Sequence, residues 1–274
     1  MMYLERKPAP PLRRFVRSLW YARMPFAKHR HERILPSGCG HIVVSLSHDF
    51  LTGFAEDGTE LRIAPGLMVG ARSVYEIVAT ADMVDMAGAL FQPGAVPAFV
   101  VDRADLISNQ NQPLDHVWSG ATDYLRSRML ESSSPEGRLH ILEDCLATRL
   151  ATRGVLSGWS PHPAVMFALE QFERETNQFP IDEIARRSGW SVRRFSQIFR
   201  EQVGFPPKVW HRLQRFQRAV RQLHSGIDVP WAEVAIDCGF YDQAHFANEF
   251  RSFSGIDLTT YTAMQPAGRH TYSG

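Results

Sequence analysis

Over roughly the first hundred residues, apolar side chains come in short runs that are rich in β-branched residues. Runs such as "GHIVVSL", "GLMVGA" and "VYEIVA" are separated by Gly, Pro and Asp, which is typical of strands joined by tight turns. The "EDG" at Glu56 to Gly58 supplies the positive backbone angles that a hairpin turn requires. This region is predicted to fold as a mostly antiparallel β domain, in the form of a small barrel.

After about residue 113 the apolar residues recur three and four apart, which is the period of a helix. Two helices are predicted at about 114–131 and 135–152, where they could cover the barrel or pair with a second copy of the chain. The segment from Arg153 to Pro163 concentrates Gly, Ser and Pro, so the domain boundary is predicted there, with domains at 1–157 and 158–274. The second domain is predicted to be all helical.

Two stretches of the second domain repeat one plan about fifty residues apart, "IDEIARRSGWSVRRFSQIF" and "WAEVAIDCGFYDQAHFANEF". Each contains a short helix, a Gly turn at Gly189 or Gly239, and a second helix with two Phe residues four apart. This is the helix-turn-helix plan, in which the second helix enters the major groove of DNA. The two second helices are predicted at about 191–202 and 242–253, and Ser191 is predicted to cap the first of them.

The linker between the repeats, Pro207 to His224, is predicted to be one helix about 27 Å long. That length can hold two recognition helices near the ~34 Å of one DNA turn. The formal net charge is only +1, but Arg residues are dense between Arg186 and Arg221. A charge run is commonly a solvated helix surface; its coincidence with the repeated helix-turn-helix plan favours DNA instead.

Composition narrows the class of protein further. With 274 residues, of which 44% are hydrophobic, the chain can bury two cores. The three cysteines are far apart, which favours neither a disulfide framework nor a metal-binding Cys motif. No run approaches the ~20 apolar residues of a membrane span, and the start is too often interrupted by Arg and Pro for a signal peptide. We expect a cytoplasmic protein without a membrane partner or a cofactor.

The C-terminal part resembles the paired helix-turn-helix domain of AraC/XylS-type bacterial transcription regulators over about residues 162–264. The resemblance lies in "FREQVGFPPKVWHRLQRFQRAVRQL" followed by "VAIDCGFYDQAHFANEFRSFSG". The family commonly has Ser-Pro after the last Gly, where this chain has Asp257 and Leu258. The resemblance implies an α+β two-domain protein that binds double-stranded DNA, is not an enzyme, and has RNA polymerase as a candidate partner.

Position by position, the resemblance implies roles in DNA binding for nine side chains. Those implied to read bases are Arg193, Ser196 and Gln197 in the first recognition helix, and Gln243, His245 and Asn248 in the second. Arg suits guanine, and Gln and Asn suit adenine. Phosphate contacts are expected from Arg194, Arg200 and Arg251.

Two of the candidate residues have open alternatives. His245, beside Phe246, either reads a base or only packs and caps. Arg215 on the linker helix either contacts a base or, as we favour, forms a structural ion pair with Asp237 or Asp242.

Many AraC-type regulators have a cupin-like effector or dimerisation domain before the DNA-binding domain, and the order here is similar. The stretch "RSLWYARMPFAKHRHERILPSGCGHIVVSL" also resembles the N-terminal domains of a less characterised branch. The resemblance therefore implies a small-molecule effector, or a homodimer formed through this domain, as the source of regulation.

The alternative interpretation of the first domain is a metal-dependent cupin-type enzyme tethered to a DNA-binding domain. His29 and His31 are spaced as two ligands from one strand, with His41 nearby. In enzymatic cupins the Glu ligand stands several residues beyond the second His, whereas Glu32 follows at once. We therefore favour a charged loop or strand edge over a metal site.

Overall fold

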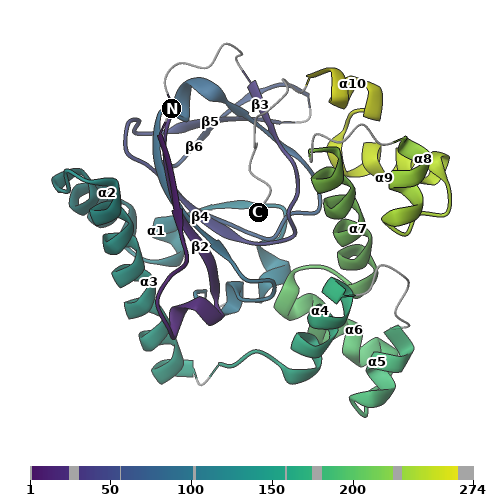
Figure 1. Ribbon diagram of the computed structural model, residues 1–274. Coiled ribbons are helices and arrows are strands. Elements are labelled where there is room, and N and C mark those ends of the chain that lie inside the picture. Colours follow the sequence, from purple (N-terminus) through teal and green to yellow (C-terminus); the bar gives the residue numbers. More distant parts are fainter. Residues whose placement is uncertain are drawn as a thin grey trace.

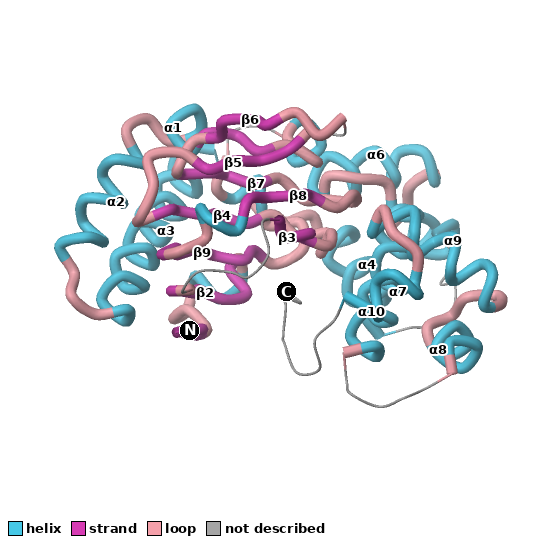
Figure 2. The backbone as a smooth tube through the Cα atoms, turned by 90° about the horizontal axis from the view of Figure 1, so that it is seen from above, coloured by secondary structure: helices cyan, strands magenta, loops and turns pink. Residues whose placement is uncertain are grey.

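A computed structural model describes residues 2–24, 31–55, 57–100, 103–157, 159–174, 181–224 and 230–264 of the chain. Its N-terminal half is β-rich and its C-terminal half is helical, so the α+β two-domain fold expected from the sequence is confirmed (Figure 1). Seen from above, the strands lie between helices α1–α3 on one side and the C-terminal helices on the other (Figure 2).

The β domain consists of two antiparallel sheets. The six strands of the first sheet are, in spatial order, β1 (Met2–Arg6), β2 (Val16–Arg23), β9 (Asp85–Phe91), β4 (His41–Ser45), β7 (Gly66–Val69) and β10 (Asn111–Pro113). The four strands of the second are β3 (His31–Ile34), β8 (Glu76–Ala79), β5 (Leu51–Phe54) and β6 (Glu60–Ile63).

The expectation of a closed barrel is wrong, because none of the described strands pairs with strands of both sheets. Closure would need a continuous hydrogen-bond ladder around the domain. Instead, β1 and β10 are the edges of the first sheet, and β3 and β6 are the edges of the second. The predicted hairpin is present between β5 and β6, where Gly58 has a φ of +84°.

The first predicted helix is two helices in the structure, α1 (Leu114–Val117) and α2 (Ala121–Glu131). Trp118 is extended and Gly120 has a φ of +68°, so the helix cannot continue between them. The second predicted helix, α3 (Pro135–Ser157), runs beyond residue 152. The helices bury apolar residues against the outer face of the first sheet, in one cluster with Leu19, Ile42, Val44, Ala89 and Phe91.

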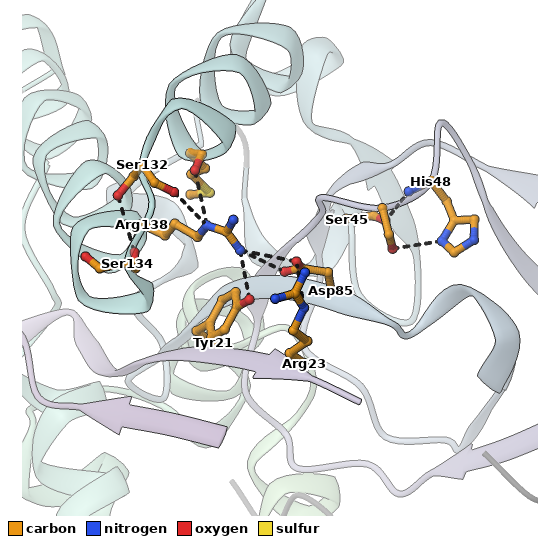
Figure 3. A network of polar contacts seen from close by, with 10 residues as sticks. Tyr21, Arg23, Ser45, His48, Asp85, Ser132, Ser134 and Arg138 are labelled. Carbon is orange, nitrogen blue, oxygen red and sulfur yellow. Dashed lines mark hydrogen bonds and ion pairs between the residues drawn. The ribbon is translucent and has the colours of Figure 1, made fainter. Parts of the chain in front are cut away.

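Arg138 of α3 connects α2 and α3 to the first sheet through hydrogen bonds (Figure 3). Its Nη1 donates to the Tyr21 hydroxyl at 2.8 Å and to both carboxylate oxygens of Asp85 at 3.2 Å. The Nε of Arg138 donates to the carbonyl oxygens of Met129, at 3.2 Å, and Ser132, at 3.4 Å, at the end of α2. Burial, followed by the hydrogen bond with Asp85, raises the pKa of Tyr21.

The described helices of the C-terminal half include the two repeated pairs and the linker helix between them. They are α4 (Pro163–Arg174), α5 (Ile181–Arg187), α6 (Val192–Val203), α7 (Pro207–Leu223), α8 (Trp231–Asp237), α9 (Gln243–Ser254) and α10 (Leu258–Met264). Where the family commonly has Ser-Pro, Asp257 accepts a hydrogen bond of 2.8 Å from the backbone N–H of Thr260 at the start of α10. None of the described helices combines the length and the apolar character that a membrane span requires.

Cys39 and Ala71 of the β domain belong to the apolar cluster of the helical half. The two halves therefore pack against each other directly. The predicted domain boundary after residue 157 coincides with the end of α3 and stays a prediction.

Replacing Arg138 with Met should lower the free energy of unfolding by about 3 kcal/mol, because the buried Asp85 carboxylate loses its closer cationic partner and keeps only Arg23, at 3.6 Å. Urea unfolding followed by tryptophan fluorescence measures the change. The matched control is Arg128→Met, which removes an exposed pair with Glu131 and should cost less than about 0.5 kcal/mol. Equal losses in both variants would contradict the role of Arg138.

Candidate nucleic-acid interface

The two helix pairs of the C-terminal half are closed by the same turn. In the first pair Gly189 has a φ of +72°, and the N–H of Trp190 donates to the carbonyl oxygen of Ala185 at 3.0 Å. In the second pair Gly239 has a φ of +79°, and the N–H of Phe240 donates to the carbonyl oxygen of Ala235 at 2.8 Å. A side chain with a Cβ would strain both Gly positions, so the turn explains why each repeat has Gly there.

The inner faces of α6 and α9 are formed by the paired Phe residues that the sequence pattern singled out. Phe195 and Phe199 of α6, and Phe246 and Phe250 of α9, are completely buried. Burial of these residues leaves the opposite face of each helix toward solvent.

Each of these helices is capped by the residue that precedes it. Ser191 accepts a hydrogen bond of 3.3 Å from the N–H of Arg194, and Asp242 accepts one of 2.7 Å from the N–H of His245. The Nδ1 of His245 accepts in turn from the N–H of Tyr241 at 3.2 Å, and its ring lies edge-on to Phe240 at 5.6 Å. His245 therefore packs and caps, and the base-reading role considered for it stays a prediction.

The residues proposed to read bases lie on the outward faces of both helices. Arg193 and Gln197 of α6 and Gln243 and Asn248 of α9 are exposed, whereas Ser196 and His245 are half-buried. On α6, Arg194 donates to Gln197 at 3.2 Å and Gln197 donates to Glu201 at 2.9 Å. This chain of hydrogen bonds orients the Gln197 amide along the exposed face.

The residues proposed to contact phosphate differ in how far they are already engaged. Arg251 is exposed on α9. The Nε of Arg200 is 3.1 Å from a carboxylate oxygen of Asp105, which lies in a short 3-10 helix of the β domain, Ala104–Leu106. Arg103 binds the same carboxylate at 2.6 Å, and its hydrogen bond is the main reason why the pKa of Asp105 is lowered. Arg200 therefore has to leave or share Asp105 to reach a phosphate.

The Arg-rich linker helix contributes less positive surface than its sequence indicates. Arg212 pairs with Glu249 of α9 at 2.7 Å, and Arg218 donates to the carbonyl oxygen of Phe172 at 2.7 Å. Arg186 and Arg187 of α5 both pair with Glu183, at 2.6 and 2.7 Å. Arg212 and Arg218 thus link α7 to other helices, whereas Arg186 and Arg187 form pairs within α5.

Arg215 is buried and donates to the carbonyl oxygen of Gly239 at 3.0 Å. Its ion-pair partner is Glu249, at 4.0 Å, so the expected pairing with Asp237 or Asp242 is wrong. Asp242 is oriented toward the N-terminus of α9 as its cap, while Glu249 points inward from the next turns of the same helix.

Two exposed side chains at this surface were missed by sequence reasoning. Tyr241, directly before the Asp242 cap, is 90% exposed. Arg103 lies 3.2 Å from Glu201 of α6 although it belongs to the β domain. The position of Tyr241 in the turn could have been noticed, whereas the place of Arg103 depends on how the two halves pack.

The described structure does not bring the residues considered for a metal site close together. His29 lies outside the described residues; His31 is exposed, with its ring 4.6 Å from that of Phe54. His41 lies between the sheets, where burial, followed by the Arg72 charge, lowers its pKa to about 4. Within the described parts of the chain, no group of three His, Cys, Asp or Glu residues could hold a metal.

Comparison with known proteins finds one matching family model in the helical half and one in the β-rich half. Residues 184–264 match a helix-turn-helix domain family, and residues 4–113 match a domain of unknown function, DUF6597. The chain is 29% identical over 86 residues to the HTH-type transcriptional activator AarP of Providencia stuartii. That alignment covers 31% of this chain and spans 63% of the length of AarP.

Two solved structures are among the matches. The DNA-binding domain of the global transcriptional factor AdpA, in complex with a target DNA, is 30% identical, with 38% of this chain and 92% of that chain covered and a TM-score of 0.34. ToxT of Vibrio cholerae with a bound unsaturated fatty acid is 9% identical, with 98% of each chain covered and a TM-score of 0.46.

Replacing Asp242 with Ala should lower the free energy of unfolding by about 1 kcal/mol, because the N–H of His245 loses its cap. Thermal or urea unfolding of the full chain measures the loss. Ser252→Ala, at an exposed position of the same helix, is the control and should change stability by less than about 0.5 kcal/mol. A neutral Asp242→Ala would show that α9 does not depend on this cap.

Proposed function

We propose that this chain, which belongs to the AraC/XylS-type family of transcription regulators, reads one DNA site by placing α6 and α9 in neighbouring major grooves. The observation that carries the proposal is the repetition of one turn, one buried Phe face and one capped, outward polar face in the two helix pairs. A repeated unit of this kind fits the repeated groove of a duplex.

The linker helix supports the same proposal through its length and its contacts. The 17 residues of α7 span about 26 Å. Arg212 and Arg215 of α7 hold α9 through Glu249 and the carbonyl oxygen of Gly239. A rigid spacer held in this way would set the distance and the angle between the two recognition helices, which have to match adjacent grooves on one face of the DNA.

Within this proposal the exposed residues divide by the part of DNA that they contact. Arg193, Gln197, Gln243 and Asn248 would read base edges, and Arg194, Arg200 and Arg251 would contact phosphates. Ser196 and His245 are half-buried, so we assign them smaller parts in base reading.

The direction of regulation and the partners are also proposals. We propose activation, because AarP, which is similar to this chain over 86 residues, is named a transcriptional activator. Contact with RNA polymerase and regulation by a small molecule or by a homodimer stay predictions; the exposed Tyr124 and Leu130 of α2 support a contact between copies.

The decisive experiment is selection of duplexes from a randomised pool by the full chain, followed by fluorescence-anisotropy titration. We expect one enriched sequence spanning two half-sites about 10 base pairs apart, bound about a thousandfold more tightly than random DNA. Equal affinity for all duplexes would contradict a sequence-specific regulator.

Substitutions on α9 should separate base reading from phosphate binding. Gln243→Ala should weaken binding to the selected duplex by about tenfold or more and leave random DNA nearly unchanged. Arg251→Ala, about two turns further along the helix, should weaken binding to both duplexes alike and lower the slope of log affinity against log salt concentration by about one. Equal losses on both duplexes for Gln243→Ala would show that this residue does not read sequence.

A further inference from the structure

The two sheets of the β domain enclose a cavity beside a small apolar cluster of Leu51, Leu67, Val69 and Met86. The cavity has a volume of about 200 Å³, and Tyr3 and Glu5 of β1 are among the residues that line it. Its walls are mostly apolar and come from the inner faces of both sheets, with Trp20, Val43, Leu67, Met86, Ile63 and Val78 among them. Because protein interiors rarely keep voids larger than a water molecule, this space indicates a binding site.

A polar group lies on one wall of the cavity. His41 and Asn111 both pair with Val69, from the strands on either side of β7. Arg72 donates to the Asn111 side-chain oxygen at 2.7 Å and lies 3.1 Å from a carboxylate oxygen of Glu76. All four polar side chains line the cavity. Apolar walls with a few polar groups on one side are typical of small-molecule sites.

The free hydrogen-bonding capacity of this group indicates what it can bind. The Nε–H of Arg72 is buried and has no hydrogen-bond partner among the described residues. Leaving such a donor unpaired is unfavourable, so an acceptor in the cavity would be stabilised. The positive charge of Arg72 is already balanced by Glu76, and His41, with its pKa lowered to about 4, is neutral at neutral pH. An uncharged oxygen therefore suits the site better than a carboxylate or an ammonium group.

One segment of the cavity wall is also a contact surface for the DNA-binding domain. The β3–β4 connector, which we define as Leu35 to Cys39, lines the cavity through Leu35, Pro36, Ser37 and Cys39. On its other side, the carbonyl oxygen of Pro36 accepts a buried hydrogen bond of 2.6 Å from Gln217 of α7.

Gly38 of the β3–β4 connector packs so closely on α7 that a Cβ there would lie 2.6 Å from Trp210 and 2.8 Å from Leu213. Just before the connector, Arg33 of β3 donates to the carbonyl oxygen of Ser254 at the end of α9, at 2.9 Å. A displacement of the connector would therefore shift the linker helix α7. A displacement of β3 would shift the second recognition helix, α9.

We propose that this cavity binds a small uncharged molecule with an apolar body and one hydrogen-bond-accepting oxygen, and that its occupancy alters DNA affinity through the β3–β4 connector. The oxygen accepts from the Nε–H of Arg72, and the body fills the space between the sheets. An engineered cavity of about 150 Å³ holds benzene, so one ring with a short chain suits this volume. The second half of the proposal rests on the proposed function in DNA binding.

Calorimetric titration of the full chain with four matched probes tests the binding half. The probes are 4-phenyl-2-butanone, 3-phenylpropionate, 3-phenylpropylamine and butylbenzene. We expect the ketone to bind about tenfold or more tightly than each of the others, because it alone combines an apolar body with an uncharged acceptor. Equal or tighter binding of the acid, the amine or the hydrocarbon would overturn the proposed ligand class. Absence of binding by all four probes would overturn it as well.

Variants locate the site. Val43→Phe should abolish ketone binding by filling the cavity, and Ile236→Phe on the exposed face of α8 should not affect it. Arg72→Lys keeps a cation beside Glu76 but removes the Nε–H, so ketone affinity should fall about tenfold while butylbenzene affinity stays the same. Unchanged ketone affinity in folded Arg72→Lys protein would overturn the assigned contact.

Anisotropy titration of the selected duplex, with and without saturating ketone, tests the coupling. We expect the Kd for DNA to change by about fivefold or more in the parent chain. Gln217→Ala should reduce this change to less than about twofold, whereas Gln214→Ala on the same helix should preserve it. An unchanged Kd in the parent chain, or full coupling in Gln217→Ala, would overturn the connector route. Since calorimetry needs no DNA, failure of duplex selection would reject the proposed function and leave the cavity result standing.

Discussion

Helix α7 has to bury its apolar face against both recognition units and against the β domain, and the arrangement of the helical half depends on this constraint. Phe216 lies 5.3 Å from the ring of Phe250 and 5.1 Å from that of Phe253 on α9. On another side of α7, Trp210 and Leu213 pack against Gly38 of the β domain. Because packed side chains transmit displacement rather than absorb it, a shift of α7 would move α9 with it.

The Arg residues of the helical half have two different placements: some hold helices together, and others stay exposed on the recognition helices. Arg212 and Arg215 are directed inward to Glu249 and to the carbonyl oxygen of Gly239, where they orient α9. Arg193 and Arg251 stay exposed on the recognition helices. With 30 Lys and Arg residues balanced by 29 Asp and Glu residues, the placement of a few cationic side chains matters more than the total charge.

The first sheet has two faces with different packing. Its outer face, with Leu19, Ile42 and Phe91, is fully buried under α2 and α3, and Arg138 fastens α3 to it. Its inner face leaves a space against the second sheet. The larger apolar cluster of the domain lies on the outer face, and the space between the sheets is bordered by the smaller cluster of Leu51, Leu67, Val69 and Met86.

Local patterns in the sequence determined the helix pairs, their Gly turns, the Ser191 cap and the buried Phe residues, because each rests on interactions within a few residues. They also determined the division into a β-rich and a helical half. Only the tertiary structure decided that the sheets stay open, that Arg215 meets Glu249, and that Arg200 meets Asp105. These contacts join distant segments, as Pro36 and Gln217 do across 181 residues, and no local period encodes which distant surfaces will meet.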